Sequence, residues 1–576
     1  MMNYRAEYER WLDNPALSES EWCELHDIRN NDEEIKSRFF APLEFGTAGL
    51  RGTMGMGLRR MNVHVVRHAT QAFASVILAE GAEAASRGVV ICYDCRINSD
   101  SFAREAACVM AANGINVRIF DALRPTPELS FAIRYHGAEA GINITASHNP
   151  KEYNGYKVYW SDGAQLPPEH ADAIAAAMEK IDVFSGVRTM DYDEAAAQGR
   201  IVTIGSETDE AFLEKVMGQS IDAEAVKRVA DRFNIVYTPF HGAGYKLVPE
   251  ALKRLGVTNL YPLPEQMVID GNFPTVKSPN PENPEGFVLA IKLARKVGAD
   301  LIIGTDPDSD RVGVITREGD AYVPITGNQM GVLLLDYIIN ARREQGTLPQ
   351  NAAAIKTIVT TEMAAKVAET NGVHIDNTFT GFKFMAEKLA EYERTGSYEY
   401  LMAYEESYGY MMGDYVRDKD AVTASMLIAE MAAHYYEKGM SLADAMHSLY
   451  EKYGYYQERT LNMVMPGLDG LEKMQRLMAR LRETPLSEIG GTAVLRQRDY
   501  RTGKLSVPEL GVVGSTEISG SNVLYYELAD GSSFIVRPSG TEPKIKIYIL
   551  VSGEDAEKCA ERVERYAAFA QTLSDM

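Results

Sequence analysis

Three aspartates occupy alternate positions in the segment GTDPDSDRVG, residues 304–313, directly after the apolar stretch ADLII. Pro307 interrupts any helix, so we expect a loop at the end of a strand. The loop carries the carboxylates of Asp306, Asp308 and Asp310, which repel one another unless a cation lies among them. Because the ligand atoms are all oxygens, the pattern predicts a site for a hard cation, Mg²⁺ or Ca²⁺.

The same segment does not fit an EF-hand calcium loop. Such a loop needs glycine at its sixth position and glutamate at its twelfth, where this sequence has Arg311 and Arg317. A solvated acidic turn is the other interpretation, and the apolar strand in front of the segment disfavours it. Three carboxylates leave coordination positions open, so the prediction is a cation site of the kind that a catalytic Mg²⁺ requires.

A serine in the segment GINITASHNPKEYNGYKVYW, residues 141–160, is the candidate nucleophile. The Asn-Pro dipeptide behind Ser147 is incompatible with a helix, so the hydroxyl could be presented at the carboxyl end of a strand. His148 and Lys157 supply a proton acceptor or a positive charge, as an activated serine requires. A hydrolase triad is disfavoured, because neighbours on an extended chain point apart and no GxSxG motif is present. An ordinary polar loop is the alternative.

Strand–helix–strand units occur three times along the chain, beginning at residues 89, 234 and 355. Each unit has an apolar strand, a helix with apolar residues at i and i+3 or i+4, a glycine at the helix end and a β-branched strand. Parallel strands need a connection as long as a helix. The pattern therefore predicts an α/β protein with three related α/β domains in tandem and mixed, largely parallel sheets.

The C-terminal stretch has a different pattern. Residues 522–551 are typical of three strands joined by an Asp-Gly turn and a loop, and residues 554–573 are typical of a helix. We expect a smaller α+β domain here. The predicted domains are domain I with the Ser147 loop, 1–205; domain II with the aspartates, 206–325; domain III, 326–460; and the α+β domain IV, 461–576.

Composition limits the partners of the chain. The 576 residues carry a formal net charge of −22 with no basic block, so neither nucleic acid nor an anionic membrane is expected, and any phosphate site needs local basic residues. The charged, amphipathic first residues differ from a signal peptide, and we expect a cytoplasmic protein. Five scattered cysteines disfavour a disulfide framework. Cys92 and Cys95 form a CxxC pair that we interpret as two small residues ending a strand.

Several motifs together resemble the α-D-phosphohexomutases. TASHNP followed by NGYKVY, together with DPDSDR, is similar to the signature pair of that family. YDCR resembles the family's YDSR, with Cys95 in place of serine. Further motifs occur in the family's order: FGTAGLRG (45–52), TPFHGAG (238–244), TGFK (380–383), YEESYGY (404–410) with VRDKD (416–420), and RPSGTEPK (537–544). The resemblance implies four domains around a central cleft, the last of them mobile.

The resemblance also implies roles for individual residues. Ser147 is similar to the serine that is phosphorylated in the resting enzyme, and it would hold one Mg²⁺ together with Asp306, Asp308 and Asp310. The other implied catalytic residues are basic groups near the phosphoserine or candidate proton acceptors: Arg51, His148, Lys157 and Lys383. The implied substrate-binding residues are Arg311 at the transferring group; Glu405 and Ser407 at the sugar ring; Thr380, Gly381 and Lys419 along the sugar side; and Arg537, Ser539, Gly540 and Thr541 at the non-reacting phosphate.

The implied activity is that of an isomerase that moves a phosphoryl group within a sugar phosphate. It would interconvert glucose 1-phosphate and glucose 6-phosphate, with glucose 1,6-bisphosphate as intermediate. The spellings TPFHGAG and YEESYGY resemble a branch that acts on glucose and ribose phosphates, so ribose, like mannose, stays an alternative. Two other classes also stay open: a sugar-phosphate sensor without catalysis, which the presence of the serine and aspartates disfavours, and a metal-assisted serine phosphatase. The sequence predicts no oligomeric state.

Overall fold

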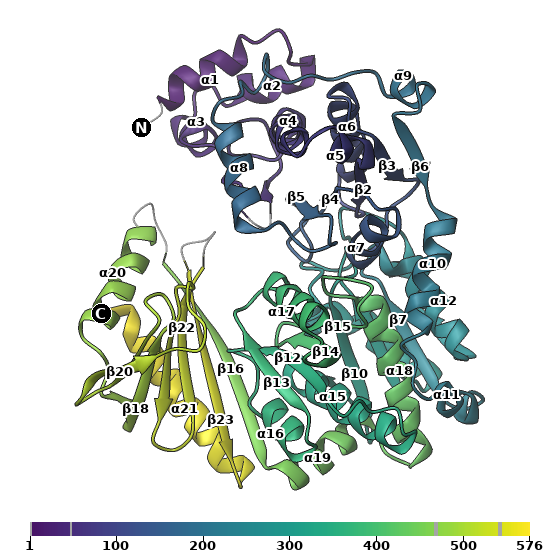
Figure 1. The fold of residues 1–576 in the computed structure, drawn as a ribbon, viewed down its shortest axis with the longest axis vertical. Helices are drawn as coiled ribbons and strands as arrows, with labels where there is room; N and C mark the ends of the chain where they lie inside the picture. Colours follow the sequence, from purple (N-terminus) through teal and green to yellow (C-terminus); the bar gives the residue numbers. More distant parts are fainter. Residues whose placement is uncertain (1–2, 47–48, 466–469, 540–543, 576) are drawn as a thin grey trace. The chain divides into compact units, whose positions relative to one another are not determined.

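The computed structural model describes residues 3–46, 49–465, 470–539 and 544–575 (Figure 1). The chain divides into two compact units. The first consists of residues 1–327 with 382–443, and the second consists of residues 328–381 with 444–576. Within the described ranges, no helix is both long enough and apolar enough to cross a membrane.

A six-stranded sheet forms the centre of the N-terminal part of the first unit (Figure 1). Its order is β1-β5-β4-β2-β3-β6; β4, β2, β3 and β6 are parallel, and β5 pairs antiparallel with β1 and β4. The strands are β1 (Leu50–Thr53), β2 (Val89–Tyr93), β3 (Val117–Phe120), β4 (Ala140–Ile144), β5 (Tyr153–Trp160) and β6 (Ile201–Ile204). The helices of this part are α4 (Val63–Ala79), α5 (Ala82–Arg87), α6 (Ser99–Ala112), α7 (Thr126–Tyr135), α8 (Pro168–Met178) and α9 (Tyr192–Ala197).

The side chains of β2 pack alternately into two different cores, one on each face of this sheet. Val89 and Ile91 belong to the core that contains α4 and α6, whereas Val90 and Cys92 pack with residues of α7. Successive side chains of a strand point to opposite faces. The uninterrupted apolar run of β2 is therefore the sequence expected for a parallel strand buried on both sides.

Three N-terminal helices extend the same core: α1 (Tyr4–Leu12), α2 (Glu19–Asp27) and α3 (Asp32–Phe39). Trp11 and Phe39 are fully buried in it, together with Leu25. Ser18 and Glu21 form a capping box, which satisfies free backbone N–H groups at the start of α2. These three helices, which carry none of the motifs named above, thus add to the core of the first sheet.

A five-stranded sheet of order β11-β10-β9-β7-β8 follows in the same unit, with β7, β8 and β9 parallel and β10–β11 an antiparallel hairpin. Its strands are β7 (Asn234–Thr238), β8 (Asn259–Pro262), β9 (Leu301–Thr305), β10 (Val312–Glu318) and β11 (Ala321–Ile325). The helices that accompany it are α10 (Ser206–Met217), α11 (Ala223–Val229), α12 (Gly244–Leu255), α13 (Pro264–Met267), the short η1 (Pro284–Phe287), α14 (Val288–Val297) and α18 (Ala421–Glu437).

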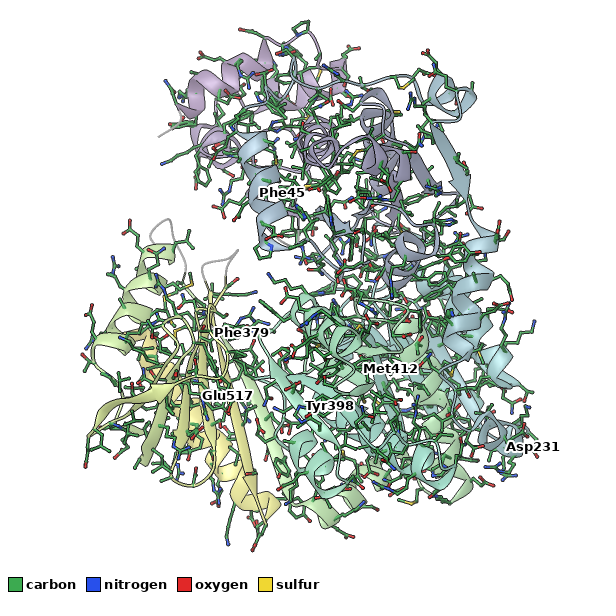
Figure 2. All side chains as sticks on the ribbon, in the orientation of Figure 1. Phe45, Asp231, Phe379, Tyr398, Met412 and Glu517 are labelled. Atoms are coloured by element: carbon green, nitrogen blue, oxygen red, sulfur yellow. The ribbon has the colours of Figure 1, made fainter. Side chains whose placement is uncertain are left out.

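Segments from later in the chain complete the first unit. Helix α18 packs against α11 and α12 (Figure 1), and α17 (Phe382–Thr395) packs on β14 (Glu399–Glu405). Strand β14 forms an antiparallel hairpin with β15 (Gly409–Met412). Side chains fill the space between these layers: Met412 is buried in β15, whereas Asp231 lies exposed before β7 (Figure 2).

The second unit contains an eight-stranded antiparallel sheet of order β16-β23-β22-β21-β18-β19-β20, with β17 paired to β18. Its strands are β16 (Tyr455–Val464), β17 (Glu488–Ile489), β18 (Thr492–Asp499), β19 (Lys504–Val507), β20 (Gly511–Ser515), β21 (Leu524–Leu528), β22 (Ser533–Pro538) and β23 (Lys544–Gly553). Helices α20 (Gly470–Glu483) and α21 (Ala556–Thr572) share its core, and the short 3₁₀ helix η2 (Leu573–Asp575) follows α21. The remaining elements are α15 (Gly327–Glu344), β12 (Ala352–Thr357), α16 (Met363–Thr370), β13 (His374–Thr378) and α19 (Leu442–Tyr453).

The predicted fold class is confirmed. Each of the three strand–helix–strand units forms parallel pairing: β2 with β3, β7 with β8, and β12 with β13. The C-terminal stretch forms antiparallel strands and the helix α21, as predicted. The sequence pattern did not indicate strands β17 to β20. Strands β19 and β20 are short and contain no buried residue, so they carry little alternation.

Glu458 on β16 is expected to make the stability of the protein depend on pH. Burial, with Glu362 adding to it, raises the pKa of the Glu458 carboxyl from 4.5 to about 7. Between these pH values the folded chain keeps a proton that the unfolded chain releases, so the free energy of unfolding falls as pH rises through this window. We expect Glu458→Gln to stabilise the protein by up to roughly 2 kcal/mol at pH 8 and to have little effect at pH 4.

Urea unfolding at both pH values measures this effect. Glu561→Gln, which changes an exposed glutamate of α21, is the matched control and should leave both curves in place. An equal shift of the Glu458→Gln curve at pH 4 and pH 8 would contradict the assignment.

Candidate functional site

The predicted acidic residues lie together in the aspartate loop, residues 306–311, between β9 and β10. One carboxylate oxygen of each of Asp306, Asp308 and Asp310 lies within 4.8 Å of the other two. Asp306 Oδ1 accepts hydrogen bonds from the backbone N–H groups of Asp310 and Arg311, both at 3.0 Å. Ser309 makes the turn in the left-handed region, with a φ of 51°. The loop therefore folds around its first aspartate.

Two carboxylate oxygens of the aspartate loop favour a cation. Asp308 Oδ1 and Asp310 Oδ1 are buried and have no hydrogen-bond partner among the described residues. The other oxygen of Asp308 accepts hydrogen bonds from Thr126 Oγ1 at 2.8 Å and Lys157 Nζ at 2.7 Å. A buried charged oxygen without a partner is costly, and oxygen ligands alone suit a hard cation. The three aspartates therefore fit Mg²⁺.

Burial and neighbouring charges set the protonation of this loop. Burial, with Asp308 and Asp310 nearby, raises the pKa of Asp306 well above its usual value. Burial would also raise the pKa of Asp308, but the ammonium of Lys157 outweighs it and lowers that pKa. The pKa of Lys157 is raised, because its two aspartate partners outweigh burial. These carboxylates therefore favour the charged form of Lys157.

Ser147 lies in the serine loop, residues 145–152, between β4 and β5, and its Oγ donates a hydrogen bond to Asp306 Oδ2 at 2.9 Å. His148 Nδ1 lies 3.2 Å from the same Oγ. The expectation that these two neighbours point apart is wrong, because Ser147 is not extended but left-handed, with a φ of 50°. Burial, with Arg311 and Arg51 nearby, lowers the pKa of His148 well below its usual value, which favours the neutral ring.

Basic side chains surround the acidic centre. Lys157 Nζ and Lys419 Nζ lie 3.4 Å and 3.2 Å from Asp310 Oδ2, and Arg311 Nε lies 3.9 Å from Asp310 Oδ1. Arg51 Nη1 donates a hydrogen bond at 3.2 Å to a side chain of the serine loop. The local positive charge that a phosphate site needs in this acidic chain is therefore present.

The predicted sugar-reading residues lie beside the aspartate loop. Glu405 ends β14, and Ser407 follows it in the sugar loop, residues 406–408, with Oγ donating to Glu405 Oε2 at 3.5 Å. Arg311 forms an antiparallel bridge with Gly409, the first residue of β15. Backbone pairing therefore joins the aspartate loop to the hairpin that carries the sugar loop.

Lys383 belongs to the same unit but has a different setting from Lys157. It lies in the first turn of α17, with Nζ 4.7 Å from the ring centre of Phe384. Burial lowers its pKa. The two lysines thus differ in setting: carboxylates favour the charged form of Lys157, whereas burial disfavours the charged form of Lys383.

The other predicted substrate-binding residues belong to the second unit. Arg537 lies on β22 and its Nη1 donates to Tyr548 Oη at 3.3 Å, and the N–H of Ser539 donates to the carbonyl of Lys544 at 2.8 Å. Two predicted positions of this unit lie between β13 and α17: Thr380 and Gly381. Two more lie outside the described residues: Gly540 and Thr541.

Several residues that the sequence analysis did not single out hold the predicted ones. Asp94 and Arg96, in the motif YDCR, contact the serine loop. The other contacts are those of Thr126 with Asp308 at 2.8 Å, Glu282 with Arg311 at 2.7 Å, and Asp418 with Lys419 at 3.0 Å. Asp94, Arg96 and Asp418 could have been singled out from the sequence, because each lies in one of the family motifs. Thr126 and Glu282 lie outside these motifs, and nothing in the sequence pointed to them.

The motif TPFHGAG, residues 238–244, packs against the aspartate loop. A Cβ atom on Gly242 would lie 2.4 Å from Pro307 Cα, and the N–H of Ala243 donates to the carbonyl of Pro307 at 2.8 Å. Glycine is therefore required at position 242 for the close approach that holds the aspartate loop in place.

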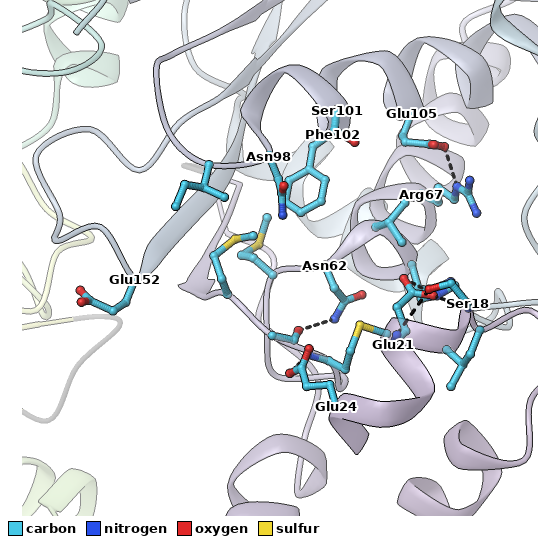
Figure 3. A pocket seen from close by; sticks show the side chains of 18 of the residues that line it. Ser18, Glu21, Glu24, Asn62, Arg67, Asn98, Ser101, Phe102, Glu105 and Glu152 are labelled. Carbon is cyan, nitrogen blue, oxygen red and sulfur yellow. Dashed lines mark hydrogen bonds and ion pairs between the residues drawn. The ribbon is translucent and has the colours of Figure 1, made fainter. Parts of the chain in front are cut away.

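A cavity of about 960 Å³ lies at another place, between α2, α4, α6 and the end of the serine loop (Figure 3). Two of its acidic side chains have partners: Glu105 pairs with Arg67 at 2.7 Å, and Glu21 accepts the N–H of Ser18 at 2.8 Å. None of the residues that line it is one of the predicted site residues. The candidate site is thus the buried cluster around Ser147 and not this hollow.

Comparison with known proteins agrees with this geometry. The chain matches the phosphoglucomutase/phosphomannomutase family, with alpha/beta/alpha domain I over residues 42–184, domain II over 210–319, domain III over 326–453 and the C-terminal domain over 500–566. A phosphoglucomutase of Staphylococcus saprophyticus is 35% identical over 558 residues, which cover 96% of this chain and 98% of that one. A phosphoglucomutase of Staphylococcus haemolyticus is 34% identical over 531 residues, covering 92% and 94%.

A solved structure supports the fold. A phosphoglucomutase/phosphomannomutase family protein from Burkholderia thailandensis superposes with a TM-score of 0.66 at 20% identity, over 92% of this chain and 97% of that one. With all four domain types matched in order and relatives above one-third identity along nearly the whole chain, the protein belongs to the phosphoglucomutase/phosphomannomutase family and is a mutase of the isomerase class.

Proposed function

We propose that the chain is a Mg²⁺-dependent phosphoglucomutase that interconverts glucose 1-phosphate and glucose 6-phosphate through a phosphoserine at Ser147. The contact of Ser147 Oγ with Asp306 at 2.9 Å carries the proposal, because it puts a nucleophile against a carboxylate cluster that fits a cation. Glucose is the sugar named for the similar staphylococcal proteins. Mannose and ribose phosphates are the competing substrates, and cytoplasm is the proposed location.

The metal would be held by Asp306, Asp308 and Asp310, with an oxygen of phospho-Ser147 as a further ligand. Bound there, Mg²⁺ would offset negative charge on the phosphoryl oxygens. Arg51, Arg311 and Lys157 add fixed positive charge around the same group. This charge matters because phosphoryl transfer needs in-line placement and charge neutralisation more than covalent help.

Ser147 takes part in both halves of the proposed cycle. The C6 hydroxyl oxygen of glucose 1-phosphate attacks the phosphorus of phospho-Ser147, so that the bond to Oγ breaks as the new bond forms and glucose 1,6-bisphosphate results. The intermediate then turns around, Ser147 Oγ takes the phosphoryl group from the C1 oxygen, and glucose 6-phosphate is released. Neutral His148, 3.2 Å from Oγ, is the proposed proton acceptor, and Lys383 is the alternative.

Recognition of the sugar phosphate is assigned to the remaining predicted residues. Glu405 accepts sugar hydroxyl protons, and Ser407 can donate or accept. The non-reacting phosphate would be held by the β22–β23 connection with Arg537, Ser539, Gly540 and Thr541, and the sugar side would be lined by Thr380, Gly381 and Lys419. We propose the domain limits 1–205, 206–325, 326–460 and 461–576, with a mobile last domain, because one phosphate site must serve both orientations of the intermediate.

Intact mass spectrometry and turnover together test this proposal. Incubation with glucose 1,6-bisphosphate should add one phosphoryl group that maps to Ser147, and glucose 1-phosphate should turn over in the presence of Mg²⁺ faster than mannose 1-phosphate or ribose 1-phosphate. Equal rates for the three sugars would overturn the glucose assignment. A protein that never carries phosphate at Ser147 yet turns over would overturn the mechanism, and release of inorganic phosphate without isomer would indicate a phosphatase.

A further inference from the structure

We propose that Arg96 is a positioning residue that holds the serine loop in its reactive conformation, and that Asp94 holds Arg96 for this purpose. Both residues lie directly after β2, and neither is among the residues proposed to touch the substrate. The inference rests on the proposed function, because the effect assigned to Arg96 is on phosphoryl transfer to and from Ser147.

The guanidinium group of Arg96 donates hydrogen bonds to several backbone carbonyl groups of the serine loop and the start of β5. Its Nη2 donates to the carbonyl of Ser147 at 2.6 Å and also to that of Asn149, and its Nη1 donates to the carbonyls of Pro150 at 2.8 Å and Tyr153 at 3.0 Å. Arg96 is 3% exposed, so water does not compete for these bonds. One side chain therefore satisfies carbonyl groups along the whole reversal of the chain from β4 to β5.

Asp94 holds this arrangement from the other side. Its carboxylate pairs with Arg96 Nε at 3.2 Å and accepts hydrogen bonds from Thr145 Oγ1 at 2.6 Å and Ser99 Oγ at 2.8 Å. Thr145 Oγ1 in turn accepts the backbone N–H of Ser147 at 2.9 Å. Both backbone polar groups of Ser147, the N–H through Thr145 and the C=O through Arg96, are thus fixed by one buried carboxylate.

The backbone of Ser147 needs this support. A φ of 50° places it in the left-handed region, which L-amino acids other than glycine, asparagine and aspartate rarely adopt. Such conformations persist only where surrounding contacts impose them, and they concentrate at functional sites. Released from Arg96, Ser147 would return to a more populated region, and its Oγ would leave the 2.9 Å contact with Asp306.

The mechanism gives this displacement a large effect on rate. The same Oγ is the leaving group in one transfer and the nucleophile in the other, so a misplaced Oγ slows both. Reacting atoms must lie about 3–3.5 Å apart, and a misplacement of about 1 Å costs roughly 100-fold in rate. Arginine is required because its planar group has five N–H donors, whereas a lysine ammonium has three and cannot reach all the carbonyls at once.

The test compares Arg96→Ala with Arg67→Ala. Arg67 is a half-buried arginine of the same part of the fold, paired with Glu105 at 2.7 Å between α4 and α6, and serves as the control for loss of an ion pair. We expect Arg96→Ala to lower kcat for glucose 1-phosphate roughly 100-fold with KM within about twofold, and to slow phosphorylation of Ser147 by glucose 1,6-bisphosphate to the same degree. Arg67→Ala should leave both rates unchanged.

Chemical rescue separates positioning from a structural role. Guanidinium ions at millimolar concentration should restore part of kcat in Arg96→Ala and none in Ser147→Ala. Arg96→Lys should keep the fold with an intermediate kcat, and Asp94→Asn should lower kcat with KM unchanged. If Arg96→Ala does not fold, these two variants test the inference in its place.

Two outcomes would overturn the inference: a folded Arg96→Ala whose kcat is within about threefold of wild type, or a loss of kcat that follows lowered thermal stability and shows no rescue. A wild-type protein without mutase activity or phosphoserine would instead overturn the proposed function, so the two failures are distinguishable.

Discussion

Ser147→Ala should reduce mutase turnover by roughly 10⁴-fold or more, because loss of a residue that forms a covalent intermediate removes the reaction path and not one contact. The variant should fold normally, since Ser147 contributes one side-chain hydroxyl to a loop held mainly through its backbone. The measurement is conversion of glucose 1-phosphate to glucose 6-phosphate with saturating glucose 1,6-bisphosphate and Mg²⁺, together with intact mass.

The matched control for this variant is Ser161→Ala, which changes an exposed serine in the turn after β5. It should retain full activity and become phosphorylated like the wild type. Retention of more than about one-hundredth of wild-type kcat by Ser147→Ala would contradict the covalent mechanism, since phosphoryl transfer would then have another acceptor.

Asp308→Asn should weaken Mg²⁺ binding at least 100-fold and lower kcat by roughly 10³-fold. Two effects add. The variant removes one negative charge from the cation site, and the same change removes the charge of the carboxylate that lies 2.7 Å from the buried ammonium of Lys157. Isothermal titration with MgCl₂ measures the affinity, and the coupled assay measures the rate at saturating and at limiting Mg²⁺.

Asp320→Asn, in the exposed turn between β10 and β11, is the control for this variant and should bind Mg²⁺ like the wild type. Unchanged Mg²⁺ affinity in Asp308→Asn would contradict the assignment of the aspartate loop as the metal site. A loss of activity with unchanged affinity would instead assign Asp308 to the orientation of Lys157 alone.

Local sequence patterns predicted the elements but not the meeting of their loops. The apolar run before Ser147 and the run before Asp306 each indicated a strand followed by a polar loop, and both strands are present as β4 and β9. The contact between the two residues joins different sheets across 159 positions of the chain. Periodicity contains no information on such a contact, and only the ordered set of family motifs implied it.

The local conformation of Ser147 was equally inaccessible from the sequence. Nothing in the neighbouring residues favours a left-handed serine, because the contacts that impose this conformation come from Asp94 and Arg96 in the segment after β2. Thr126 is a similar case: at the start of α7 it has the pattern of an ordinary first helical turn, and only the fold brings its hydroxyl to Asp308. The roles of residues that act through long-range contacts therefore could not be predicted from a single sequence.

The bridge between Arg311 and Gly409 has a consequence for the exchange of loops between this protein and its relatives. A Cβ atom at Gly409 would lie 2.3 Å from Lys419 Cδ, so a larger residue at position 409 would require Lys419 to move. The bridge to Arg311 therefore depends on the packing of Gly409 against Lys419. Residues 304–313 and 404–420 are therefore matched to each other, and a chimaera that imports one segment alone would pair a foreign backbone edge with a native one. We therefore expect single side-chain replacements within these segments to be tolerated better than the grafting of one whole loop.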